Sequence, residues 1–159
     1  MAIEFRTVPV DEGDGLRLAA AMVDEMRVVY DGLDLDAADM PKAGPDELGP
    51  PDGVFLVGYD GDEAVACGGV KRFADGIGEI KRMYVVPDRR GSGVAQALLA
   101  ALEDEARRLG HATVRLDTGD RQPGARRLYE KAGFQEIGNY NGNPAAAYFG
   151  EKHLPPSVR

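Results

Sequence analysis

One segment of the sequence places two arginines and two glycines where an apolar run changes into a helical pattern. It reads VVPDRRGSGVAQALL, residues 85–99. Gly91 and Gly93 lack Cβ atoms, so an anion can approach the backbone closely, and the first amides of a helix have no acceptors within it. Arg89 and Arg90 add positive charge that suits phosphate oxygens. The segment therefore predicts a binding site for a pyrophosphate group.

The residues of this turn exclude two common phosphate-binding loops. A nucleoside triphosphate loop needs a lysine followed by Ser or Thr, and a dinucleotide loop needs a third glycine where Gln96 or Ala97 stands. Residues 90–95, RGSGVA, instead fit the pattern Q/R-x-x-G-x-G/A and resemble the coenzyme A loop of the GNAT superfamily of N-acyltransferases. Residues 122–134, QPGARRLYEKAGF, resemble the second signature of that family, N-x-x-A-x-x-L-Y-x-x-x-G-F.

The resemblance implies that acetyl-CoA is the cosubstrate and that its acetyl group passes to a primary amine by direct attack in a ternary complex. The acceptor would be a small molecule or a peptide. A family member would hold coenzyme A through the strand before the turn, the turn itself and the start of the second signature. The matching residues are Met83, Tyr84, Val85, Arg89, Arg90, Gly91, Ser92, Gly93, Val94, Ala95 and Gln122. Gln122 replaces the usual Asn, so its contact requires the loop to adjust.

Two alternatives remain open from the sequence. A non-catalytic coenzyme A-binding or regulatory module would keep the glycine turn and lack turnover. A nucleotide-binding protein on an α/β sheet would prefer ATP or NAD, although neither of those loop patterns is present.

Two side chains are candidates for the proton transfers that acetyl transfer requires. A lysine-like amine has a pKa near 10.4, so presenting it neutral at pH 7 costs about 4–5 kcal/mol, and the leaving thiolate needs a proton. The resemblance places Tyr129 near the thioester sulfur as the acid, against the alternative of a core aromatic residue. Glu79 is the candidate base, directly or through water, against the alternative of an ion pair with Lys81 or Arg82.

The acceptor is expected to enter between two loops, residues 31–52 and residues 138–148. The acidic residues of the first loop would attract an amine, and polar residues of the second would line the opposite wall. These residues are Asp31, Asp34, Asp36, Asp39, Tyr140, Asn141 and Asn143.

Hydrophobic periodicity and turn residues predict the elements that position these side chains. Strands are expected at 3–8, 54–60, 62–73, 77–86, 112–118, 134–137 and 146–154, and helices at 14–30, 94–109 and 123–132. A short helix is expected at 35–40, where four nearby prolines prevent a longer one. The resemblance implies a bulge in the strand at 77–86, which would explain the mixed alternation of its side chains. Glu103 and Arg107 have the i,i+4 spacing of an exposed ion pair.

Together with the resemblance, this order predicts an α/β (α+β) fold. The expected architecture is a GNAT-like mixed, mostly antiparallel central sheet of about seven strands, flanked by about four helices. The length of 159 residues suits one domain, which we place at residues 1–154, with a tail at 155–159.

Charge and composition limit the partners. The net charge is −8, and the first 63 residues hold 16 acidic against 4 basic residues. An acidic chain is repelled by nucleic acids and anionic membranes, so neither is expected as a partner. The first residues lack the pattern of a signal peptide, which predicts a cytoplasmic protein. Cys67 is the only cysteine and the two histidines lie far apart, so we expect no metal site. A homodimer is possible, because many members of the family form one.

Overall fold

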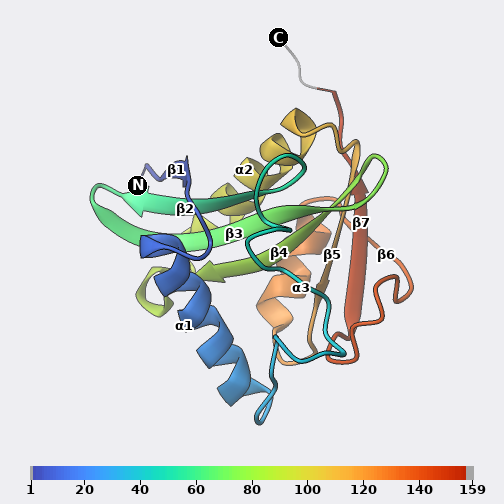
Figure 1. Ribbon diagram of the computed structural model, residues 1–159, viewed down its shortest axis with the longest axis horizontal. Helices are drawn as coiled ribbons and strands as arrows, with labels where there is room; N and C mark the ends of the chain where they lie inside the picture. Colours follow the sequence, from blue (N-terminus) through green and yellow to red (C-terminus); the bar gives the residue numbers. More distant parts are fainter. Residues whose placement is uncertain (1, 157–159) are drawn as a thin grey trace.

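The computed structural model describes residues 2–156, which form one seven-stranded sheet with helices on both faces (Figure 1). The elements in chain order are β1 (Glu4–Thr7), α1 (Gly13–Val29), β2 (Val54–Asp60), β3 (Glu63–Ala74), β4 (Ile77–Val85), a 3₁₀ turn η1 (Pro87–Arg89), α2 (Val94–Arg108), β5 (Thr113–Thr118), α3 (Pro123–Lys131), β6 (Gln135–Glu136) and β7 (Tyr148–His153). Residues 157–159 of the expected tail lie outside the described residues.

The strand order is β1-β2-β3-β4-β5-β7-β6. Only β4 and β5 pair in parallel, and the other neighbours are antiparallel. The predicted fold class, a mixed and mostly antiparallel sheet of about seven strands, is therefore confirmed. Gly61, with φ of +60°, makes the tight turn between β2 and β3 that glycine permits.

The helices differ from the prediction in two respects. Within residues 2–156 there are three α-helices rather than about four, and the expected helix at 35–40 is a series of turns. The Asp34 carboxylate accepts a hydrogen bond from the Asp36 amide at 2.9 Å, which competes with helix formation. Glu103 does not form the exposed pair with Arg107 either: it is buried and accepts a bond from Lys152 on β7 at 2.8 Å.

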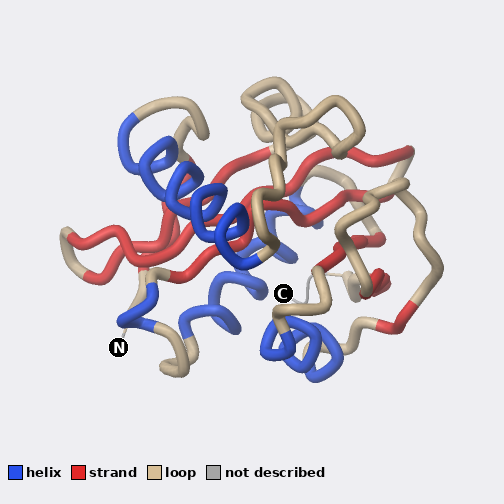
Figure 2. The backbone as a smooth tube through the Cα atoms, turned by 90° about the horizontal axis from the view of Figure 1, so that it is seen from below, coloured by secondary structure: helices blue, strands red, loops and turns tan. Residues whose placement is uncertain are grey.

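The sheet separates two apolar layers (Figure 2). On one face α2 and α3 cover a core that includes Leu98, Leu102 and Leu116, and on the other α1 and the loop 31–53 cover a smaller core around Leu18 and Phe55. Strand β2 contributes to both layers through its alternating side chains. No helix of the described part is long and apolar enough to cross a membrane.

The predicted bulge is confirmed on β4. Cys67 of β3 pairs with Tyr84 and Gly69 pairs with Lys81, so the single residue between them opposes two residues of β4. One of these two is Arg82, whose φ of +61° lies in the left-handed region.

Beyond this point β4 has separated from β5. The parallel pairing has only three registered pairs and ends where Glu79 pairs with Arg115. The remainder of β4 diverges from β5 and opens the sheet.

Candidate active site

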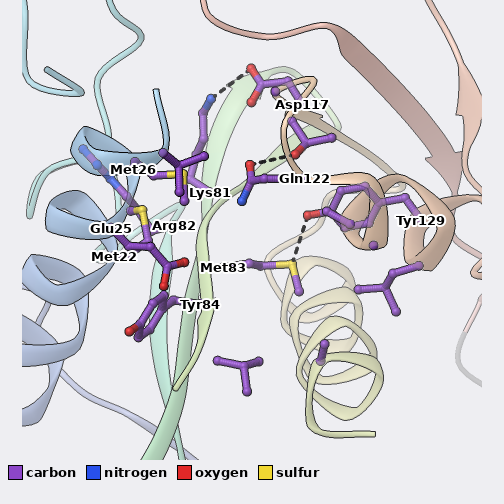
Figure 3. Close-up of a pocket in the computed structure, with 18 of the residues that line it drawn as sticks. Met22, Glu25, Met26, Lys81, Arg82, Met83, Tyr84, Asp117, Gln122 and Tyr129 are labelled. Carbon is purple, nitrogen blue, oxygen red and sulfur yellow. Dashed lines mark hydrogen bonds and ion pairs between the residues drawn. The ribbon is translucent and has the colours of Figure 1, made fainter. Parts of the chain in front are cut away.

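A cavity of about 990 Å³ lies at the divergence of β4 and β5 (Figure 3). One half is bounded by the turn before α2 and by α3, and we call it the turn half. The other half lies against α1 and the loop 31–53, and we call it the α1 half. Strand β4 lines both halves, since residues 80–85 all contribute.

The glycine turn has the backbone that the sequence predicts for anion binding. Gly91 and Gly93 have φ of +78° and +89°, and a Cβ at either position would meet no heavy atom within 4 Å. The Ala97 amide donates to the Gly93 carbonyl, so the amides of residues 94–96 precede the first bond of α2. Gly91, Gly93, Ala95 and Gln96 line the cavity. These residues fit a pyrophosphate group, which accepts bonds from amides at a helix N-terminus.

Ser92 and Val94 contribute to the turn differently. The Ser92 hydroxyl donates to the Arg89 carbonyl at 2.5 Å, which stabilises the turn. The Val94 side chain is buried in the core beneath α2. Contact between either residue and a ligand would therefore involve the backbone.

Both arginines of the turn line the cavity and are bound by carboxylates. Arg89 donates to Asp60 at 2.6 Å and Glu63 at 2.7 Å. Arg90 donates to Glu25 of α1 at 2.8 Å and to the Val85 carbonyl at 2.9 Å. These carboxylates already balance part of the positive charge of the two arginines. The interaction of Arg89 and Arg90 with phosphate stays a prediction.

Met83, Tyr84 and Val85 follow the bulge and line the cavity. Because β4 has left β5 at this point, their peptide groups are not part of a β4–β5 ladder. Gln122 also lines the cavity, and its side-chain oxygen accepts a bond from Thr118 at 3.0 Å. The loop before α3 is thus tied to the end of β5.

Tyr129 of α3 is buried and lines the cavity. Its hydroxyl lies 3.9 Å from the Met83 sulfur (Figure 3), so the structure brings together two residues 46 positions apart. Burial, and then the charge of Asp117 and the neighbouring Tyr148, raise the pKa of this phenol. The hydroxyl therefore remains a proton donor at neutral pH. Tyr129 is thus a core aromatic residue that also lines the cavity, and its role as the acid stays a prediction.

Glu79 lies behind the cavity wall rather than among the residues that line it. Its carboxylate is 1% exposed and accepts bonds from Tyr140 at 2.5 Å and Asn141 at 2.8 Å. The Lys81 ammonium lies 3.3 Å away, so the ion pair weighed as an alternative is present. Glu79 could therefore act in catalysis only indirectly, through Tyr140, Asn141 or Lys81.

Asp117 is the carboxylate that the sequence analysis missed. It lies near the end of β5, lines the cavity, and accepts bonds from Asn141 at 2.7 Å and Asn143 at 3.2 Å. Lys81 lies 3.4 Å from it (Figure 3). The same ammonium lies 3.3 Å from Glu79, and thus between two carboxylates. The sequence did hold a signal for Asp117: it is an acidic residue near the end of a strand, β5, that runs parallel to β4.

The four aspartates expected to attract an amine do not line the cavity. Asp31 binds Arg121 at 2.8 Å, Asp36 lies 3.3 Å from Arg82, and Asp34 caps a local turn. Of the three polar residues expected in the late loop, Asn143 lines the cavity, whereas Tyr140 and Asn141 are directed to Glu79. The expectation of a cationic acceptor therefore has no support from these side chains.

Cys67 is a buried residue beneath the bulge. Its thiol lies 3.6 Å from the Arg82 carbonyl, and burial raises its pKa to about 12. The thiol is protonated at neutral pH and is a poor nucleophile.

Comparisons with known proteins agree with this geometry. The sequence profile of the Acetyltransferase (GNAT) family matches residues 20–134. An IAA acetyltransferase from Azospirillum brasilense is 38% identical over 110 residues, which are 67% of this chain and 72% of the relative. A crystal structure assigned to the acyl-CoA N-acyltransferases, from Klebsiella pneumoniae, has a TM-score of 0.74 and 31% identity, covering 96% of this chain and 97% of that chain.

A structural neighbour was solved with the expected ligand. The PaiA N-acetyltransferase from Thermoplasma acidophilum, in complex with coenzyme A, has a TM-score of 0.69 at 16% identity, covering 97% of this chain and 100% of that chain. Proteins of the GNAT family use acetyl-CoA, and these matches favour neither a non-catalytic module nor a nucleotide-binding protein. The chain belongs to the GNAT family and is a GNAT-type N-acetyltransferase.

Proposed function

We propose that this protein transfers the acetyl group of acetyl-CoA to a primary amine of a small molecule or peptide by direct attack in a ternary complex. The observation that carries the proposal is one cavity of about 990 Å³ that is lined by the glycine turn, by Tyr129 and by residues of α1. Acceptor and donor can thus meet without a covalent enzyme intermediate, and Cys67, the only cysteine, is buried.

Acetyl-CoA supplies an activated acetyl group as a thioester. The turn amides of residues 91–96 would hold its diphosphate, as expected of a helix N-terminus. The backbone of Met83, Tyr84 and Val85 would pair with its pantetheine arm, as an edge strand pairs with an added strand. An amide of the same segment would donate to the thioester oxygen and stabilise the negative charge that develops there.

Two proton movements complete the reaction. The neutral acceptor nitrogen forms the C–N bond while the C–S bond breaks, so the nitrogen loses a proton and the sulfur gains one. We assign the acid to Tyr129, which lines the cavity and is protonated at neutral pH. We assign the base to the carboxylate pair around Lys81, in which Asp117 lines the cavity and Glu79 lies behind it.

The test is a screen of primary amines with acetyl-CoA, read as release of free thiol and as an acetylated product by mass spectrometry. Amine-dependent thiol release is the expected result. Cys67 does not interfere with the thiol reagent, because it is buried and protonated. Binding of coenzyme A without thiol release from any amine would contradict the proposal and favour a non-catalytic module. A preference for ATP or NAD over coenzyme A in a thermal shift assay would contradict it as well.

A further inference from the structure

Arg82 has an unusual backbone and an unusual side-chain environment. It is the bulge residue with φ of +61°, a conformation that costs an L residue free energy relative to glycine. Its side chain is only 11% exposed, and its Nη1 atom is buried without a hydrogen-bond partner in residues 2–156. A buried donor of a charged group that has no acceptor is destabilising. Glycine would adopt this bulge conformation at a lower cost, so the backbone does not explain why the residue is an arginine.

The guanidinium has one anionic neighbour, and that neighbour is exposed. Its Nη2 atom donates to Asp36 at 3.3 Å, a long bond for a charged pair, and the Asp36 side chain is 75% exposed. Arg82 lines the cavity, so an anion that entered it would compete with the exposed Asp36 carboxylate for the guanidinium. Arginine can bind a carboxylate through two such atoms at once.

The other cations of the α1 half are more fully engaged. Lys81 lies between Glu79 and Asp117. Arg121 donates to Asp31 at 2.8 Å and to the Val29 carbonyl at 2.6 Å. Within the described part of this half, Arg82 is thus the cation with a side-chain donor that has no acceptor.

The wall beside Arg82 is apolar. Met22 and Met26 of α1 lie next to it (Figure 3), and Met40 and Leu35 of the following loop line the same half. A guanidinium in a poorly hydrated wall attracts an anion more strongly than one in water. Methionine side chains accommodate apolar groups of varied shape. This half therefore fits a molecule with an apolar body and one anionic group.

We propose that the acceptor amine also carries an oxyanion, such as a carboxylate, and that Arg82 binds this group and so selects the substrate. The inference rests on the proposed acetyl transfer and specifies its acceptor class. Arg82 acts here in binding and orientation, while the attacking nitrogen lies toward Asp117 and the thioester.

The test compares each free acid with its primary amide. The probes are L-leucine, L-methionine, L-phenylalanine and 6-aminohexanoate with their amides, assayed for kcat/KM with acetyl-CoA. The wild-type protein is expected to prefer the acid of at least one pair by 10-fold or more. In Arg82→Gln the ratio is expected to fall to within about 3-fold of one. The amino group of a free acid and that of its amide differ in basicity. Because this difference is the same for the wild-type protein and for Arg82→Gln, it cancels when the two acid-to-amide ratios are compared.

Two further variants separate binding from folding. Arg82→Gly relieves the left-handed backbone, so it should fold and lose the preference for acids as Arg82→Gln does. Arg72→Gln is the control, because Arg72 pairs with Asp75 at the β3–β4 turn and does not line the cavity. It should keep the preference of the wild-type protein.

The outcomes separate this inference from the proposed function. No preference for acids in the wild-type protein, or the same preference in Arg82→Gln, would overturn the inference and leave acetyl transfer intact. If no probe is acetylated, the same pairs are compared by thermal shift with coenzyme A bound. If an acid raises the Tm of the wild-type protein more than its amide does, and this difference disappears in Arg82→Gln, the result would support the inference even without turnover. Equal increases in Tm for the acid and its amide would overturn it.

Discussion

Gly93 and Gly110 stand at opposite ends of α2 in the same left-handed backbone region, with φ of +89° and +91°. A Cβ at either position would meet no heavy atom within 4 Å. Only Gly93 lines the cavity. We therefore predict that Gly93→Ala and Gly110→Ala lower stability to the same extent, whereas only Gly93→Ala weakens the binding of coenzyme A.

The magnitude follows from the backbone and from one hydrogen bond. An alanine in the left-handed region costs about 1–2 kcal/mol relative to glycine. For a chain of this length that corresponds to a decrease of roughly 2–8 °C in Tm. At Gly93 the added methyl also obstructs the approach of an anion to the turn amides. Losing one hydrogen bond to a charged group costs about 1.5–3 kcal/mol, or roughly a 10- to 100-fold increase in Kd.

The assay combines thermal denaturation with calorimetric titration of coenzyme A on both variants. Equal decreases in Tm with a Kd change confined to Gly93→Ala are the expected result. A Kd in Gly93→Ala that matches the wild-type value would refute the assignment of the turn to the diphosphate. Equal weakening in Gly110→Ala would show that the effect comes from stability rather than from contact with the ligand.

The remaining predictions concern catalysis and pH. Tyr129→Phe should lower kcat by about 100-fold or more while the Kd for coenzyme A changes little, because only the proton donor is lost; an unchanged kcat in steady-state kinetics would remove this role. Asp117→Asn should lower kcat more than Glu79→Gln does, because Asp117 lines the cavity and Glu79 lies behind it, whereas the reverse result would assign the base to Glu79. The folded-state pKa of Cys67, about 12 against an ordinary 9.0, keeps the native thiol protonated after the unfolded thiol ionises. Its contribution to the free energy of unfolding is therefore complete below pH 9 and falls by up to about 1.4 kcal/mol per pH unit toward pH 12. Urea titrations should show a shallower decline in Cys67→Ala, and identical slopes would contradict the burial argument.

The sequence was sufficient to predict the elements, because periodicity reports directly which side chains are buried. Val94, Leu98 and Leu102 recur every four residues, and each is at most 1% exposed beneath α2. Gly61 lies in a hairpin turn and Gly110 at a helix end, and the positive φ values at both positions favour glycine. Local patterns of this kind need no knowledge of the rest of the chain.

Pairings between distant side chains were beyond such patterns. The i,i+4 spacing of Glu103 and Arg107 favours an ion pair along an isolated helix, but β7 brings Lys152 to Glu103 instead. Asp117 was missed for the same reason, because its importance depends on where β5 ends relative to β4. A charge in a sequence indicates what a residue can bind, and only the fold determines which partner reaches it.

The bulge on β4 shows how one inserted residue builds both halves of the cavity. Ile80, Met83 and Val85 pack on the α2 side, whereas Tyr84 packs on the α1 side, so the alternation shifts by one position after Lys81. Gly68 lies opposite, where a Cβ would come within 2.9 Å of Leu102. The shift directs Met83 to Tyr129 and leaves its neighbour Arg82 on the α1 side. A regular strand would turn Met83 away from Tyr129, so the contact between them depends on the strained backbone of Arg82.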